Sequence, residues 1–305
     1  MNALKTTIFM ATLFGLFLLI GRLLGGQQGL VIGFAIALAT NFFAYWFSDK
    51  MALSMSGAQP IRPQQAPRLH AMIARLSERA DIPMPRVYVI PSGQPNAFAT
   101  GRNPQNAAVA VTGGILRALP EEELEGVLAH ELAHIKNRDI LLSSVAATMG
   151  GAISFIAQML QFRAFFGGYG GSDDEESGSP LGALLAALVA PVAATMIQLA
   201  ISRTREFDAD RSGAQISGNP LGLASALRRI ETAAERAPMP VNPAASHMFI
   251  INPLGGDRLA GLANLFRTHP RTEERVAKLE EFARESGGGA GAHPRGRAAT
   301  TGRRF

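Results

Sequence analysis

The stretch GVLAHELAHIKNRD, residues 126–139, contains the pattern H-E-x-x-H from His130 to His134. On an α-helix, side chains four positions apart lie on the same face, so both histidines can direct a ring nitrogen at one metal ion. Glu131 then lies beside a metal-bound water. We therefore predict a zinc site with His130 and His134 as ligands. A chance match on an ordinary amphipathic helix is the alternative.

The flanking residues predict the helix independently. Pro120 suits a first helical position, and three glutamates follow it in the first turn, where the helix dipole favours negative charge. Apolar side chains recur at helical spacing. They predict a buried stripe of Leu124, Val127, Leu128, Leu132 and Ile135.

The composition restricts the ligands and the partners. The chain has 305 residues and no cysteine, so metal ligands must be histidine, aspartate or glutamate. The net charge is +5, but residues 286–305 hold four arginines and no acid, which leaves 5 − 4 = +1 for the rest. We expect this glycine-rich tail to be disordered. Elsewhere the sequence has no basic patch with interleaved aromatics, so we expect no nucleic-acid partner.

Two uncharged apolar runs, residues 7–20 and 30–47, lie near the N-terminus. Lys5 precedes the first run, as in a signal peptide, but no convincing cleavage site follows and the second run comes at once. The second run ends in an aromatic cluster with Trp46, the single tryptophan, which is typical of a bilayer interface. We predict an uncleaved pair of membrane-spanning helices.

Two further runs, residues 140–160 and 181–201, have no charged side chain over 21 positions each. That length crosses about 30 Å of hydrocarbon. Both runs are rich in alanine and glycine, which occur where membrane helices pack closely. We predict a second membrane hairpin, and a buried hairpin of a soluble domain is the alternative.

The region between the two hairpins has a mixed helix and strand pattern. Residues 66–80 have helical spacing, and residues 86–90 and 107–111 are typical of short strands. Between the strands lies NAFATG, residues 96–101. Two interpretations remain open: an edge strand or loop that pairs with extended substrate, with Asn96 contributing a hydrogen bond, or a plain surface turn.

Lysine and arginine near the ends of the four runs predict the orientation in the membrane. Arg22 and Arg163 lie on one side. Six residues lie on the side of the N-terminus and the His130 helix: Lys5, Lys50, Lys136, Arg138, Arg203 and Arg205. We therefore expect both termini and the metal site to be cytoplasmic.

A catalytic zinc site requires three protein ligands and one open position. Directly after the fourth run comes SRTREFDAD, residues 202–210, where Glu206 and Asp210 share one helical face. We predict Glu206 as the third ligand and Asp210 as the acceptor that orients a ligand histidine. Asp210 or Asp208 is the alternative ligand, and a solvated charged helix face is the alternative to any site.

The second hairpin explains how Glu206 can reach His134. The two residues are 72 positions apart, of which residues 140–201 account for 62, so the effective separation is 72 − 62 = 10 residues. Each lies within six positions of a predicted span. At about 1.5 Å per helical residue, we expect the zinc within roughly 10 Å of the hydrocarbon edge.

Four motifs resemble those of the HtpX family of membrane-bound heat-shock zinc metalloproteases, which is related to the CAAX prenyl endopeptidases. They are NAFATG at 96–101, HELAH at 130–134, SRTREFDAD at 202–210 and HPRTEER at 269–275. The resemblance covers nearly the whole chain except the basic tail. It implies that His130, His134 and Glu206 bind one Zn²⁺ and that Glu131 is catalytic.

The resemblance also implies the activity and the location. We expect an endopeptidase of the cytoplasmic membrane that cleaves misfolded or damaged membrane proteins on the cytoplasmic side. We expect these substrates and the lipid bilayer as its partners, and a functional overlap with other membrane quality-control proteases is possible. Glu131 would take a proton from water and pass it to the leaving amine. His269 is one candidate donor to the developing oxyanion, and a structural loop histidine is the alternative.

The expected fold class is a mainly α membrane protein with four transmembrane helices and a cytoplasmic α+β zincin-like metalloprotease domain that contains a small sheet. Residues 1–48 form the first hairpin and residues 140–201 the second. The protease domain comprises residues 49–139, with the H-E-x-x-H pattern, and residues 202–285, with the third ligand. Residues 286–305 form the tail.

Overall fold

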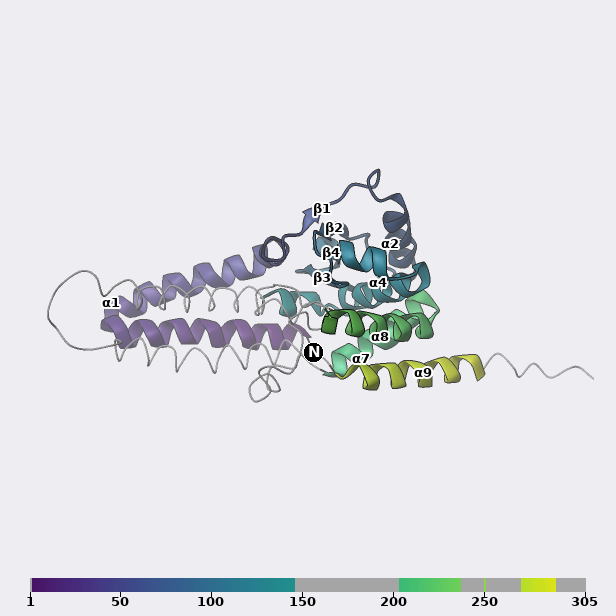
Figure 1. Ribbon diagram of the computed structural model, residues 1–305. Coiled ribbons are helices and arrows are strands. Elements are labelled where there is room, and N and C mark those ends of the chain that lie inside the picture. The colour runs from purple at the N-terminus through teal and green to yellow at the C-terminus, as the bar shows by residue number, and fades with distance from the viewer. Residues whose placement is uncertain (1, 146–202, 237–249, 251–269, 289–305) are drawn as a thin grey trace, which may run out of the picture.

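The computed structural model describes residues 2–145, 203–236, 250 and 270–288. Figure 1 shows a long helical hairpin that extends from a domain of helices around a small sheet. The predicted second hairpin and the basic tail lie almost wholly outside the described residues. Of the second hairpin, the structure describes the beginning, a helix from Ile140 to Val145.

Helix α1, Asn2–Met55, forms the N-terminal hairpin. Its helical dihedral angles are interrupted at Gly25 (φ −137°) and Gly26 (φ 55°, ψ −129°), so the chain reverses there. The two halves then lie side by side (Figure 1). A Cβ added to Gly21 would lie 2.2 Å from the carbonyl oxygen of Gly29, so glycine at these positions lets the two backbones touch.

The second half of α1, Gly25–Met55, is the one helix within the described ranges that is long and apolar enough to cross a membrane. The first half, Thr6–Arg22, is apolar but shorter. Large apolar side chains of the second half are exposed, among them Val31 and Ile32 at 60% each and Leu38 at 57%. This helix supports the predicted membrane anchor, and the total of four spans stays a prediction.

A four-stranded sheet follows the hairpin, with the strand order β1-β2-β4-β3. Its strands are β1 (Gln59–Pro60), β2 (Arg86–Ile90), β3 (Ala97–Gly101) and β4 (Ala107–Thr112). The central strands β2 and β4 are parallel, whereas β1 and β3 pair antiparallel at the two edges. The small sheet is therefore confirmed, and the NAFATG segment forms an edge strand instead of a surface turn.

Helices cover both faces of this sheet. The main hydrophobic core joins one face to α2, Pro67–Ala80, and to α4, Glu121–Lys136, and includes all five residues of the predicted apolar stripe. The C-terminal end of α1 packs on the other face, where Ala52 and Leu53 join Phe98. Since both faces are covered, all six residues of β4 are buried.

Three further helices complete the core around α4. They are α7 (Arg203–Ser217), α8 (Pro220–Arg236) and α9 (Thr272–Gly288). Helix α4 contacts α2, α7, α8 and β3, so it lies at the centre of the domain (Figure 1). Short helical turns, η1 (Pro104–Asn106) and α3 (Gly113–Ala118), connect β3, β4 and α4.

Candidate metal centre

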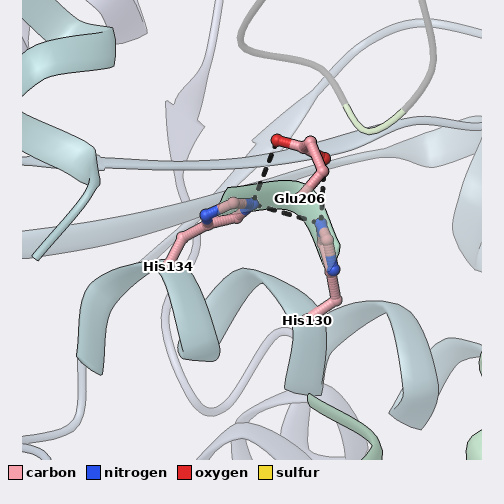
Figure 2. A group of neighbouring side chains, drawn as sticks. All are labelled: His130, His134 and Glu206. Carbon is pink, nitrogen blue, oxygen red and sulfur yellow. Dashed lines mark hydrogen bonds and ion pairs between the residues drawn. The ribbon is translucent and has the colours of Figure 1, made fainter. Parts of the chain in front are cut away.

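The two histidines of the H-E-x-x-H pattern lie one turn apart on α4 and face the same point. Their Nε2 atoms are 3.2 Å apart, with the rings nearly perpendicular (Figure 2). His130 is fully buried, whereas the side chain of His134 is 17% exposed. The pair therefore forms a site that is closed from one side and open beside His134.

Glu206 reaches this pair from the first turn of α7. Its Oε1 lies 3.7 Å from His134 Nε2 and its Oε2 lies 3.8 Å from His130 Nε2 (Figure 2). The three ligand atoms all lie within 4.8 Å of one another. The structure thus brings together the three residues that the sequence predicts as metal ligands.

A close approach of two helices positions Glu206. A Cβ added to Gly213 would lie 2.8 Å from both the backbone N and the Cα of His130. Glycine is therefore required where α7 crosses α4. Gly213 lies two turns after Glu206 on the same helix. This contact therefore fixes the position along α4 at which the Glu206 carboxylate faces the histidines.

A second carboxylate contacts each histidine on its other nitrogen. Asp210 Oδ1 lies 2.9 Å from His130 Nδ1, as the sequence predicts for an orienting acceptor. Asp139 Oδ2 lies 3.2 Å from His134 Nδ1, a partner that the sequence analysis missed. When each Nδ1–H donates to its carboxylate, Nε2 of each ring presents a lone pair to the shared point.

Arg275, on the first turn of α9, is a further residue that the sequence analysis missed. It is 1% exposed and donates from Nε and Nη2 to the two oxygens of Asp210, at 2.8 and 2.7 Å. Its Nη1 lies 3.8 Å from Glu206 Oε2. Arg275 belongs to the HPRTEER motif, which was the available signal. It neutralises part of the negative charge that gathers around the two histidines.

Glu131 is 3% exposed and lies beside the ligand cluster. Burial raises the pKa of Glu131, and the nearby Glu206 carboxylate raises it further. The two histidines and the backbone N–H of Ala99, on the edge strand β3, lower it in part. A carboxyl whose pKa lies above its ordinary value is suited to take up a proton from water.

His134 is held in a strongly acidic environment. Burial by itself would lower the pKa of His134, but the hydrogen bond to Asp139 and the charges of Glu206, Glu131 and Asp139 raise it to about 9. Without a metal ion, the ring therefore binds a proton at neutral pH. A cation bound between the Nε2 atoms would replace that proton.

The distances between the three ligand atoms match those of a tetrahedral zinc site. Two ligand atoms about 2.1 Å from the metal then lie roughly 3.4 Å apart. The observed separations are 3.2 Å between the two nitrogens and 3.7 and 3.8 Å from nitrogen to carboxylate oxygen. Two imidazoles and one carboxylate also form the ligand set of many catalytic zinc sites with an open fourth position. The residues present therefore fit zinc.

The remaining candidates have clear positions or lie outside the described residues. Asp208 is exposed on α7, away from the cluster, and Asp210 contacts Nδ1 of His130 instead of the shared point. Asn96 is buried, and its Oδ1 accepts a hydrogen bond from the backbone N–H of Ala97 at the start of β3. His269 lies outside the described residues, so its role stays a prediction.

Comparison with known proteins identifies the family. The model of peptidase family M48 matches residues 63–283, well over half of the chain. The chain belongs to peptidase family M48. The matched M48 region runs from just before α2 into α9, so it contains the three clustered residues, Asp139, Asp210 and Arg275, but leaves out the α1 hairpin.

Curated relatives place the chain beside the HtpX proteases within M48. A "Protease HtpX homolog" of a Sulfurihydrogenibium species is 54% identical over 296 residues, which cover 95% of this chain and 99% of the relative. The corresponding protein of Persephonella marina is 55% identical over 291 residues, covering 94% and 99%. The chain is thus a metalloprotease of the M48 family, and the predicted resemblance is confirmed.

Among solved structures, the M48 chain is similar to the crystal structure of Ste24p from S. mikatae. The TM-score is 0.49 and the sequence identity is 17%. The match covers 92% of this chain and 65% of that one.

Proposed function

We propose that this metalloprotease is a zinc-dependent endopeptidase of the cytoplasmic membrane that cleaves misfolded or damaged membrane proteins on the cytoplasmic side. The observation that carries the proposal is the cluster of His130, His134 and Glu206 around one point, with Glu131 beside it. The donor set supports zinc as the metal, since two imidazoles, one carboxylate and no thiolate suit a catalytic zinc ion.

Each residue has a distinct part in the proposed reaction. Bound zinc would lower the pKa of a water molecule and polarise the scissile carbonyl. Glu131 accepts the proton of the attacking water, since its carboxyl lies beside the metal ligands. Glu131 then passes the proton to the leaving amine. Asp210 and Asp139 hold the two imidazoles in the orientation that directs Nε2 at the metal.

The outer edge of β3, on the side away from β4, is the proposed binding surface for an extended substrate backbone. Two contacts support this. The backbone N–H of Ala99 interacts with Glu131, so the edge runs beside the proposed base. The carbonyl oxygen of Ala97 accepts a hydrogen bond of 3.1 Å from the backbone N–H of Ile250, so this edge already pairs with extended backbone. Substrate would replace Ile250 there.

The position of the site beside the helix that begins at Ile140 supports action at a membrane surface. Asp139 contacts His134, and the next residue begins the helix of the predicted third span. Ser144 on that helix hydrogen-bonds to Thr100 of β3, with 2.7 Å between their hydroxyl oxygens, which ties the helix to the strand beside Glu131. Four spans with both termini in the cytoplasm, as the distribution of lysine and arginine predicts, would place the site in the cytoplasm close to the bilayer.

Such a position favours substrates that are themselves membrane proteins. A segment of a misfolded membrane protein that emerges from the bilayer would meet β3 and Glu131 within a short distance. Removal of such proteins would give this enzyme a function that overlaps with other membrane quality-control proteases.

A cleavage assay with the full chain in detergent tests the proposal. The substrates are an unfolded soluble protein and a membrane protein truncated so that it cannot fold. We expect zinc-dependent cleavage of both by the wild type, and loss of cleavage with retained zinc in Glu131→Gln. Glu121→Gln, an exposed position on the same helix, is the matched control. Cleavage by Glu131→Gln at the wild-type rate would contradict the proposal.

A further inference from the structure

A cavity of about 510 Å³ lies where the C-terminal end of α1 meets the sheet. Its lining includes two groups of side chains, one aromatic and one basic. Aromatic rings of α1 form one part, and basic side chains of α1, β2 and the turn after β3 form the other. The residues that define it are Phe42, Trp46, Lys50, Arg86 and Arg102. None of the metal-site residues lines this cavity, so it is separate from the catalytic centre.

The cavity carries a net positive charge. Lys50, Arg86 and Arg102 line it, and among its described lining residues Asp49 is the one acid, which gives 3 − 1 = +2. Asp49 is buried and pairs with Arg86 at 2.5 Å, so its charge is already balanced. Lys50 and Arg102 therefore present their charges to a ligand. An anion is the ligand that this arrangement favours.

Aromatic rings hold two of these cations in place. The guanidinium of Arg102 lies 4.6 Å from the centre of the Trp46 ring, and the ammonium of Lys50 lies 5.3 Å from that of Phe47. Cation–π contacts of this kind restrict both side chains without neutralising them. The anion site is therefore partly formed before any ligand binds.

The position of the cavity along α1 indicates where the anion comes from. Phe42 and Trp46 are 52% and 44% exposed at the end of the apolar run, as is typical of a bilayer interface. Lys50 follows Phe42 by eight residues, about 12 Å along a helix. In a bilayer whose interface lies at Phe42 and Trp46, that distance would span the change from acyl chains to charged headgroups, with the apolar part of the cavity toward the lipid tails and the basic part toward the phosphates.

We propose that this cavity binds the headgroup phosphate of an anionic phospholipid. Lys50 and Arg102 contact the phosphate, and Phe42 and Trp46 pack against the glycerol and the first acyl carbons. Arg102 directly follows Gly101, the last residue of β3, and Ala99 of that strand contacts Glu131. A bound lipid therefore fixes the end of the strand that runs beside the catalytic glutamate.

The fluorescence of the single tryptophan measures ligand binding directly. Trp46 lines the cavity, and no other tryptophan contributes to the signal. The full chain in neutral detergent is titrated with a short-chain phosphatidylglycerol, with phosphatidylcholine of the same chain length, and with inorganic phosphate. We expect a saturable change with phosphatidylglycerol and none with phosphatidylcholine or phosphate at equal concentration. Equal responses to the two lipids, or saturation by inorganic phosphate alone, would overturn the proposal.

A charge-matched comparison separates the site from general attraction to anionic micelles. The variants Lys50→Gln and Arg102→Gln are each expected to weaken phosphatidylglycerol binding roughly fivefold. Arg68→Gln removes the same charge from an exposed position of α2 and should bind like the wild type. Circular dichroism of all three variants shows whether they are folded. Folded Lys50 and Arg102 variants that bind as tightly as Arg68→Gln would also overturn the proposal.

Discussion

Asp210 Oδ1 lies 2.9 Å from His130 Nδ1, and both oxygens of the same carboxylate accept hydrogen bonds from the buried guanidinium of Arg275. One side chain thus connects α4, α7 and α9, three helices that are far apart in the sequence. Burial alone would raise the pKa of Asp210, but the charge and hydrogen bonds of Arg275, together with His130, lower it. The Asp210 carboxylate therefore stays ionised and accepts a hydrogen bond from Nδ1–H of His130.

Removal of Arg275 should destabilise the domain strongly. Arg275→Gln leaves the Asp210 carboxylate buried without its bidentate partner, and breaking a buried ion pair in this way costs about 3–5 kcal/mol. The double variant Asp210→Asn/Arg275→Gln should recover part of that loss, since no unpaired charge remains. Chemical unfolding of the metal-free chain measures both. If Arg275→Gln were as stable as the wild type, the ion pair between Asp210 and Arg275 would not stabilise the domain.

Asp139 should contribute to metal affinity without binding the metal itself. Its contact with His134 Nδ1 orients the ring, and removal of such an outer partner lowers metal affinity roughly 10–100-fold. Asp139→Asn should therefore lose zinc to a chelating dye at a lower dye concentration than the wild type. Glu122→Gln, on the exposed side of α4, serves as the control. Equal zinc affinities in Asp139→Asn and Glu122→Gln would show that Asp139 does not contribute to metal binding.

A single methyl group at Gly213 should disturb the metal site from a distance. The added Cβ would lie 2.8 Å from the backbone of His130, so α7 must move away from α4 and carry Glu206 with it. We expect Gly213→Ala to lower stability by about 1–3 kcal/mol, as overpacking does, and to weaken zinc binding. Ser212→Ala, on the neighbouring position of α7, should change neither. Gly213→Ala with unchanged zinc affinity would show that the helix crossing does not set the position of Glu206.

The ion pair between Glu123 and Arg229 should make stability depend on pH. Burial would raise the pKa of Glu123, but hydrogen bonds from Arg229 and Ser225 and the charge of Arg229 outweigh it, so the pKa lies below its ordinary value of 4.5. A carboxyl with a lowered pKa stabilises the fold above its unfolded pKa, and this stabilisation is lost as the pH falls through the folded value.

The test compares wild type and Glu123→Gln, both metal-free, from pH 7 to pH 3. The difference in their free energies of unfolding should be full at pH 6–7 and shrink as the pH falls below about 4.5. Glu122→Gln, which changes the adjacent exposed carboxyl, should show no such trend. A difference that stays constant over this range would mean that the charge of Glu123 does not stabilise the fold.

The sequence predicted those parts of the site that follow from local periodicity. His130 and His134 share a face because they are four apart on one helix, and Glu206 was predicted because the expected second hairpin would return the chain to the same side of the membrane. Asp139 was missed because the chain leaves the helix at Arg138, whose φ is +59°, so helical spacing no longer places the next residue. Arg275 was missed because its contact with Asp210 depends on how α9 packs against α7.

For the fold too, local periodicity predicted the individual elements but not how they pack. The strands at residues 86–90 and 107–111 were predictable from their short apolar runs, and the helix that carries the motif from the helical spacing of its apolar side chains. The order of the strands was not predictable, because it depends on contacts between segments that are far apart in the sequence. In particular, nothing in the sequence indicated that β2 and β4 are parallel neighbours and that β3 lies at the edge. This order leaves β3 at the edge of the sheet, where Ala99 lies beside Glu131.

The zinc content of two variants of α7 tests the central claim most directly. Glu206→Gln removes the proposed third ligand, and Asp208→Asn removes an exposed carboxylate two positions later on the same helix. We predict one zinc per chain for the wild type and for Asp208→Asn by elemental analysis after dialysis, and little zinc for Glu206→Gln. One zinc per chain in Glu206→Gln, bound as tightly as in the wild type, would contradict the account of the metal centre.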